Sequence, residues 1–112
     1  MCGFTGFIGG KNKDRKFLEF TVQKMANTIR HRGPDDSGIW VDSKLGVCLA
    51  HRRLSVIDLS SAGHQPMHAA SGRYVMVFNG EIYNHNKLRS ELEQAGQAPA
   101  RRGHSDTETL MA

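Results

Sequence analysis

Cys2 is the residue whose position most directly suggests chemistry. Removal of Met1 would leave a thiol and a free α-amine on this one residue. An α-amine has a pKa of about 7.7–8.0, so it can act as a base for the neighbouring thiol near neutral pH. The position is therefore consistent with an N-terminal nucleophile. Free cysteines also serve as small packing residues, and we assign Cys48, inside an apolar run, to that class.

Asn79 and Gly80 follow an apolar run at 74–78 and offer a second chemical feature. A side-chain amide and a glycine N–H that face one small pocket can stabilise the oxyanion of a tetrahedral intermediate. An Asn-Gly pair is also a common turn. Taken alone, the pair leaves both interpretations open.

Arg53 and Asp106 carry the opposite charges that would recognise a free amino acid. Arg53 adjoins an apolar run at 54–59 and can form a bidentate contact with a carboxylate, although most arginines are solvated or paired at the surface. Asp106 can bind an ammonium group, or it can simply favour the N-terminus of the helix that it opens.

Neither a metal site nor a phosphate-binding loop is predicted. The two cysteines and six histidines form no CxxC, no HExxH and no tight cluster. The glycines before Lys11 do not match a GxxxxGK loop, because Thr5 stands where the first glycine is required and no Ser or Thr follows the lysine.

The composition is that of one globular unit, or of part of one. The chain has 112 residues, of which 38% are hydrophobic and 23% charged, with a net charge of +4. The basic residues are scattered, so no nucleic-acid partner is expected. No apolar run approaches the length of a membrane span, and two cysteines without a secretory context favour a reducing compartment. We therefore expect a cytoplasmic protein with no membrane partner.

The apolar spacing predicts the elements that position these side chains. A buried strand is expected over 3–8, followed by a helix that Asp14 caps and that ends before His31. The apolar positions of that helix follow 3, 4 spacing: Leu18, Val22, Met25 and Ile29.

Turn residues divide the remainder of the chain. Strands over 39–41 and 46–50 are expected to form a hairpin through 42–44, and 74–78 is expected to form a further strand. Asn84 is predicted to cap a second helix, with Leu88 and Leu92 on its inner face and Gly96 at its end.

The last residues match a capping box. Ser105 is followed at the third position by Glu108 and then by apolar residues, which predicts a helix that begins here. Because the sequence stops at Ala112, we expect a domain truncated partway, whose apolar sheet faces lack part of their cover.

Five segments taken together resemble one known family. They are MCGFTGF at 1–7, HRGPDDSG at 31–38, RRLSVIDL at 52–59, FNGEIYN at 78–84 and SDTE at 105–108. Over essentially the whole chain, the sequence resembles the N-terminal class II glutamine amidotransferase domain of glutamine-hydrolysing asparagine synthetases. Amidotransferases of sugar-phosphate and purine pathways share the N-terminal cysteine and the Asn-Gly turn, but they differ around the arginine.

The resemblance implies an enzyme that hydrolyses glutamine to glutamate and ammonia. Cys2 would attack the side-chain amide of glutamine and form a glutamyl thioester, which water then releases as glutamate. Asn79 and the N–H of Gly80 would form the oxyanion hole.

The resemblance also implies how glutamine is held. Arg53 would bind the α-carboxylate, and Asp106, with Glu81 nearby, the α-ammonium group. Arg52 is a local departure that competes for the arginine role, and we assign that role to Arg53 because it directly precedes the Leu-Ser motif. The backbone that would line the pocket is that of Leu54, Ser55, Val56 and Ile57.

The implied fold is α+β, the first part of the four-layer αββα sandwich of N-terminal nucleophile hydrolases. Residues 1–112 would be a type-2 glutamine amidotransferase domain, without the ATP-dependent synthetase domain that makes asparagine from aspartate. No cofactor and no metal are expected in this segment, since ATP and Mg would belong to that absent domain. The implied partners are glutamine and the synthetase domain in cis, and a homodimer is compatible.

Two alternatives stay open from the sequence. The parent protein would belong to the same family but transfer ammonia to another acceptor, in polysaccharide or peptide biosynthesis. Otherwise the segment would be an inactive binding module on the same fold. A retained Met1 would block the α-amine and favour the binding module.

Overall fold

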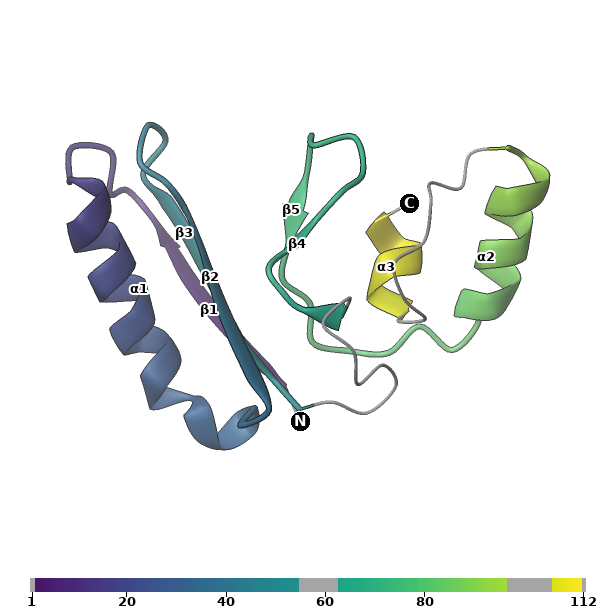
Figure 1. Cartoon of the computed structure of the whole chain (residues 1–112), viewed down its shortest axis with the longest axis horizontal. Helices are drawn as coiled ribbons and strands as arrows, with labels where there is room; N and C mark the ends of the chain where they lie inside the picture. Colours follow the sequence, from purple (N-terminus) through teal and green to yellow (C-terminus); the bar gives the residue numbers. More distant parts are fainter. Residues whose placement is uncertain (1, 55–62, 97–105, 112) are drawn as a thin grey trace.

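The computed structural model describes residues 2–54, 63–96 and 106–111. Its elements are, in chain order, β1 (Gly3–Ile8), α1 (Arg15–Thr28), η1 (Arg30–Arg32), β2 (Asp36–Asp42), β3 (Val47–Arg53), β4 (Met67–His68), β5 (Val75–Met76), α2 (His85–Gln94) and α3 (Asp106–Met111). Along the longest axis, α1 is followed by the sheet of β1, β2 and β3, then by β4 and β5, and then by α3 and α2 (Figure 1). The chain is therefore a small mixed α and β domain.

The larger sheet is antiparallel, with β3 in the centre and the strand order β1-β3-β2. Helix α1 covers one of its faces (Figure 1). The buried core between helix and sheet consists of Leu18, Val22, Ala26, Val41, Cys48 and Ala50. Removing a side chain such as that of Leu18 from water contributes about 1.5–3 kcal/mol, so this core holds helix and sheet together. The predicted helix face is correct at Leu18 and Val22, but Ala26 rather than Met25 is fully buried.

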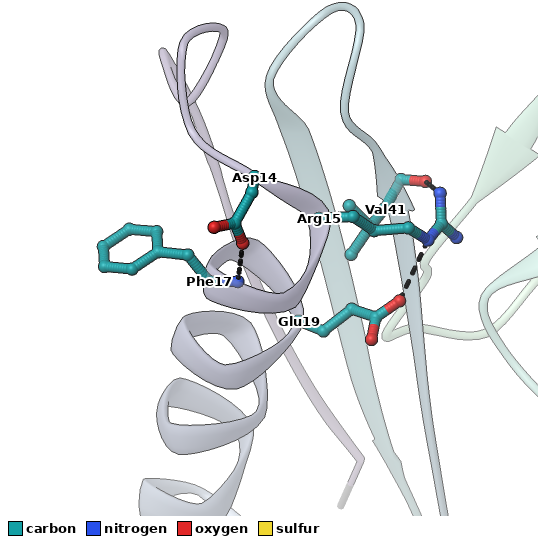
Figure 2. Close-up of polar contacts among 5 residues, drawn as sticks. All are labelled: Asp14, Arg15, Phe17, Glu19 and Val41. Atoms are coloured by element: carbon teal, nitrogen blue, oxygen red, sulfur yellow. Dashed lines mark hydrogen bonds and ion pairs between the residues drawn. The ribbon is translucent and has the colours of Figure 1, made fainter.

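The first turn of α1 is fixed by two polar side chains. Asp14 caps the helix as predicted, because its Oδ1 accepts a hydrogen bond of 2.8 Å from the N–H of Phe17 (Figure 2). Arg15 donates through Nε to Glu19 at 3.0 Å and through Nη1 to the carbonyl of Val41 at 3.3 Å (Figure 2). Arg15 thus links α1 to β2.

The hairpin between β2 and β3 forms where the turn residues predicted it. Asp42 Oδ1 accepts hydrogen bonds from the N–H groups of Lys44 and Leu45 at 3.0 and 3.1 Å. The expected strand over 46–50 is wrong at its first residue, because Gly46 belongs to this turn and has a left-handed φ of +68°. Both strands are longer than the predicted 39–41 and 46–50, since each continues to the end of its partner.

The strand β3 presents different residues to the two faces of the sheet. Cys48 and Ala50 lie in the core beneath α1, so strand alternation places Arg52 on that side. His51 and Arg53 belong to the opposite face, which looks toward β4 and β5 (Figure 1). The separation of these two faces determines which side chains can take part in the site.

The expected strand over 74–78 is wrong in its length, because only Val75 and Met76 pair with β4. Phe78 leaves the ladder because side chains bind its backbone instead. Its N–H donates to Gln65 Oε1 at 2.7 Å, and its carbonyl lies 3.3 Å from His51 Nε2. The chain is thereby turned out of the small sheet just before Asn79.

The two C-terminal helices pack against each other. Asn84 occupies the N-cap position of α2, but its side chain makes no capping hydrogen bond, which differs from the prediction. Gly96, with a φ of +68°, ends the helix region as expected. A helix begins at Asp106, while Ser105 of the predicted capping box lies outside the described residues. In the described part of the chain, no helix has the length and apolar character of a membrane span.

Candidate active site

The Cys2 thiol contacts the backbone at the end of β3. Its Sγ donates to the carbonyl of Leu54 at 3.4 Å and accepts a hydrogen bond from the N–H of Leu54 at 3.2 Å. The cysteine is half-buried, and the two residues are 52 positions apart in the chain. Both backbone groups of Leu54 therefore bind the sulfur, and the thiol has a defined place in the fold.

The register of β1 and β3 brings Cys2 beside Arg53. Gly3 pairs with Arg52, so one further step along the ladder sets Cys2 opposite Arg53. Opposed residues of an antiparallel pair project from the same face, which assigns the two side chains to the same side of the sheet. The carbonyl of Cys2 also accepts a hydrogen bond of 3.0 Å from Nη2 of Arg32 in η1.

The two adjacent arginines have different surroundings. Arg52 donates through Nε to the carbonyl of Gly33 at 3.0 Å, on the side of the sheet that α1 covers. Arg53 is only 8% exposed and lies on the other face, with its guanidinium against Gly63. A Cβ built on Gly63 would come within 2.4 Å of Arg53 Nη2. The arginine on the same face as Cys2 is therefore Arg53.

The loop after η1 packs directly on the end of β3. The N–H of Asp35 donates to the carbonyl of Arg53 at 2.9 Å, and Pro34 forms a bridge with the same residue. A Cβ on Gly33 would lie 2.2 Å from the backbone carbonyl carbon of Arg52, so only glycine fits there. These contacts place the loop at 33–35 against the end of β3, the strand end that Leu54 follows.

The segment that follows Gly63 crosses the same face of the sheet. His64 Nδ1 and Asp36 Oδ2 lie 2.5 Å apart. Gly38 of β2 has no room for a side chain, because a Cβ there would lie 2.2 Å from the carbonyl oxygen of Gln65. Because Gly38 has no side chain, Gln65 can approach β2 closely and can reach the backbone of Phe78.

His51 and Gln65 are two buried polar residues on this side of the sheet that the sequence analysis did not single out. His51 is 1% exposed and Gln65 7% exposed, and both bind the backbone of Phe78. Burial lowers the pKa of His51, although the hydrogen bond to Phe78 and the charge of Asp36 act in the opposite direction. Strand alternation places His51 on the face of Arg53, a signal that was present in the sequence. For Gln65 no local signal existed.

Asn79 and Gly80, the predicted oxyanion pair, directly follow Phe78 in the chain. Asn79 is half-buried, whereas Gly80 and Glu81 are exposed. A Cβ on Gly80 would lie 2.9 Å from the ring of Phe78.

The remaining predicted residues are described less completely. Asp106 is the first residue of α3, and its side chain lies outside the described part of the structure. The pocket-lining positions that also lie outside it are Ser55, Val56 and Ile57.

A separate apolar pocket of about 350 Å³ lies between α2 and α3. It contains none of the residues to which chemistry was assigned, being lined by Ile82, Leu88, Glu91, Leu92, Ala95, Thr109 and Leu110.

Over residues 2–54, 63–96 and 106–111, no group of three or more His, Cys, Asp or Glu side chains is arranged to hold a metal ion.

A known protein family matches the whole of this chain. The profile of a family described as glutamine amidotransferase domain matches residues 1–112, the whole of the chain. The chain belongs to the glutamine amidotransferase domain family. The resemblance drawn from the five motifs is thereby confirmed at the level of the family.

The similar curated proteins include glutamine-hydrolysing asparagine synthetases. Asparagine synthetase 3 of Bacillus subtilis is 39% identical over 113 residues, which cover 99% of this chain and 17% of that protein. Asparagine synthetase B of Escherichia coli is 38% identical over 112 residues, covering 100% and 19%. The amidase chry2 of Gibberella zeae is 35% identical over 120 residues, covering 100% and 17%. The chain thus spans 17–19% of the length of these relatives.

Proposed function

We propose that this chain is the glutaminase part of a glutamine-hydrolysing amidotransferase and that Cys2 is its nucleophile. Two observations support the proposal. The Cys2 thiol forms hydrogen bonds with the N–H and the carbonyl of Leu54, and the strand register puts Arg53 on the same face of the sheet as Cys2. A packing cysteine has no need of a buried arginine on the same face, nor of an Asn-Gly pair directly after Phe78, whose carbonyl contacts His51 of that face.

The proposed reaction has two chemical steps. After removal of Met1, the α-amine of Cys2 takes the thiol proton, and the sulfur attacks the side-chain carbonyl carbon of glutamine. Asn79 and the N–H of Gly80 stabilise the oxyanion, the C–N bond breaks, and ammonia leaves with the proton from the amine. Water then attacks the thioester, which breaks the C–S bond and yields glutamate and the free thiol.

Charge complementarity supports the mode of substrate binding. Arg53 binds the α-carboxylate of glutamine, and Asp106 binds its α-ammonium group, with Glu81 nearby. The near-complete burial of Arg53 supports this role, because a carboxylate that reaches a desolvated guanidinium gains a strong charge-assisted contact. In this proposal the backbone of Leu54, Ser55, Val56 and Ile57 would line the glutamine pocket.

We also propose how the whole protein uses the ammonia. Relatives named asparagine synthetase support a parent that uses the ammonia to make asparagine from aspartate, in a cytoplasmic enzyme whose synthetase domain follows in cis. That domain, and not this segment, would bind ATP and Mg, and the parent would be compatible with a homodimer. A relative named amidase supports the alternative that the acceptor is another molecule.

The order of elements in Figure 1 supports a four-layer fold. Helix α1, the β1-β3-β2 sheet, the β4-β5 pair and the C-terminal helices follow one another along the long axis. This is the sequence of layers in an αββα sandwich of the N-terminal nucleophile class, of which the chain would form the first part.

The proposal is tested by covalent labelling of the full-length protein with a glutamine analogue that carries a diazoketone. Mass spectrometry should find Cys2 labelled, with its α-amine free, and Cys48 unmodified. The Cys48→Ala variant is the matched control, since it removes the other thiol and should retain the label. Modification of Cys48 alone, or an N-terminus that still carries Met1 in labelled protein, would overturn the proposal.

A further inference from the structure

The backbone of Phe78 is held on both sides by side chains from elsewhere in the chain. Gln65 Oε1 accepts from the N–H of Phe78 at 2.7 Å, and His51 Nε2 lies 3.3 Å from its carbonyl oxygen. A carbonyl only accepts, so the shared proton sits on Nε2 of His51. Phe78 lies beyond the end of β5 and outside its pairing with β4, so the two side chains determine the orientation of its two peptide groups.

The carbonyl of Phe78 and the N–H of Asn79 belong to one planar peptide unit. By holding that carbonyl, His51 fixes the plane from which the backbone of Asn79 continues. Gln65 fixes the preceding plane, through the N–H of Phe78. The two contacts together set the direction in which Asn79 and the following Gly80 leave the sheet.

Both bracing residues are themselves firmly placed. His51 is 1% exposed and lies in β3, the central strand of the larger sheet. Gln65 is 7% exposed, its carbonyl lies against Gly38 of β2, and its neighbour His64 pairs with Asp36. The brace thus joins the sheet that carries Cys2 to the turn that carries the proposed oxyanion donors.

We propose that His51 and Gln65 are positioning residues that aim the Asn79–Gly80 pair at the oxyanion formed during attack by Cys2. The proposal rests on the glutaminase function set out above and deepens it. Neither side chain touches substrate; each acts through the backbone of Phe78. Donors of this kind stabilise charge only where it develops, so a loss of aim should appear in the chemical step and not in glutamine binding.

The first test compares His51→Leu with His51→Gln in the full-length protein. Leucine removes the donor, whereas the amide of glutamine can place an N–H near the position of Nε2. Because both oxyanion donors remain but are less well aimed, we expect kcat of His51→Leu to fall about ten- to a hundredfold with KM little changed. His51→Gln should recover most of the loss. Gln65→Leu removes the other contact and should resemble His51→Leu.

A second measurement distinguishes misplacement of the Asn79–Gly80 donors from a general loss of structure around Cys2. Iodoacetamide alkylates a thiolate in one displacement, in which the S–C bond forms and iodide leaves, so no oxyanion develops. In a Cys48→Ala background, the alkylation rate of Cys2 should be the same with His51 or Leu at position 51. Val41→Ala is the control for loss of core packing, because Val41 lies on the face covered by α1 and should leave kcat close to that of the parent.

The outcomes distinguish this inference from the function on which it rests. If His51→Leu retains the parent kcat, or if its kcat and its alkylation rate fall together, the positioning role is wrong while glutamine hydrolysis stands. If the parent protein itself does not release ammonia from glutamine, the proposed function is overturned, and the positioning role with it.

Discussion

The sulfur of Cys2 is bound by both backbone groups of Leu54, as acceptor of its N–H at 3.2 Å and as donor to its carbonyl at 3.4 Å. A strand end and a chain terminus are thereby joined at one point. An N–H that points at sulfur stabilises the negative charge of an attacking thiolate. The contact places the thiol, and in the proposed reaction it would also promote its attack.

Removal of the Leu54 N–H should slow the reaction of Cys2. Leu54→Pro deletes this donor, and proline suits the position because the preceding Arg53 is already extended. An ordinary hydrogen bond contributes about 1 kcal/mol, so the rate of thioester formation should fall about fivefold. Leu54→Ala keeps the N–H and is the control. Burst kinetics with glutamine measure the rate, and equal rates in the two variants would argue against the role of this contact.

The two arginines should respond differently to substitution. Arg53→Ala removes the proposed partner of the substrate carboxylate, which costs about 2–5 kcal/mol where the pair is desolvated, so KM for glutamine should rise by orders of magnitude. Arg52→Ala loses the bond to Gly33 instead and should lower thermal stability with a much smaller change in KM. Steady-state kinetics of both variants decide the matter. A larger rise in KM for Arg52→Ala would reverse the assignment.

Gly63→Ala should disturb binding more than folding. The added Cβ would meet the end of the Arg53 side chain, which can shift, so stability should change little while the guanidinium moves from its position. A displacement of about 1 Å can cost up to about a hundredfold, and we expect a rise in KM. Gly33→Ala is the contrast, since its Cβ would meet backbone and should unfold the protein at lower temperature. An unchanged KM in Gly63→Ala would contradict the proposal that the Arg53 guanidinium binds glutamine from its present position.

His51 should make stability depend on pH below neutrality. Its pKa is lowered from the ordinary 6.5 by burial, with His64 and Arg53 acting in the same direction and Phe78 and Asp36 against it. In acid the unfolded chain takes up a proton that the folded chain resists, so stability should fall as pH drops through and below 6.5. Thermal unfolding of His51→Gln should show a smaller decline. The exposed His31→Gln is the control, and an unchanged decline in His51→Gln would refute the role of His51.

The parts of the fold set by local chemistry could be predicted from the sequence. Asp14 caps α1 and Gly96 ends the helix region, because a side-chain acceptor and a left-handed backbone act within one turn. The turn at Asp42 is equally local. Strand lengths could not be predicted in this way, since β2 and β3 extend as far as their partner allows.

The site divides along the same line. Cys2, Arg53 and the pair at 79–80 could be proposed from the sequence because their residue types and motifs are informative. The different surroundings of Arg52 and Arg53 depend on which side of β3 is covered by α1, and this is a tertiary feature that the sequence does not reveal. Gln65 was not singled out from the sequence, because its contact with Phe78 requires that it pack closely against Gly38, and no local sequence pattern predicts that packing.

The role of Cys2 as the nucleophile of a glutaminase can be measured as glutamine-dependent ammonia release from the full-length protein. The Cys2→Ala variant should release no ammonia above background, because it retains the pocket but lacks the sulfur. Cys48→Ala, buried beneath α1, should release ammonia at close to the parent rate. Undiminished ammonia release by Cys2→Ala would contradict the account.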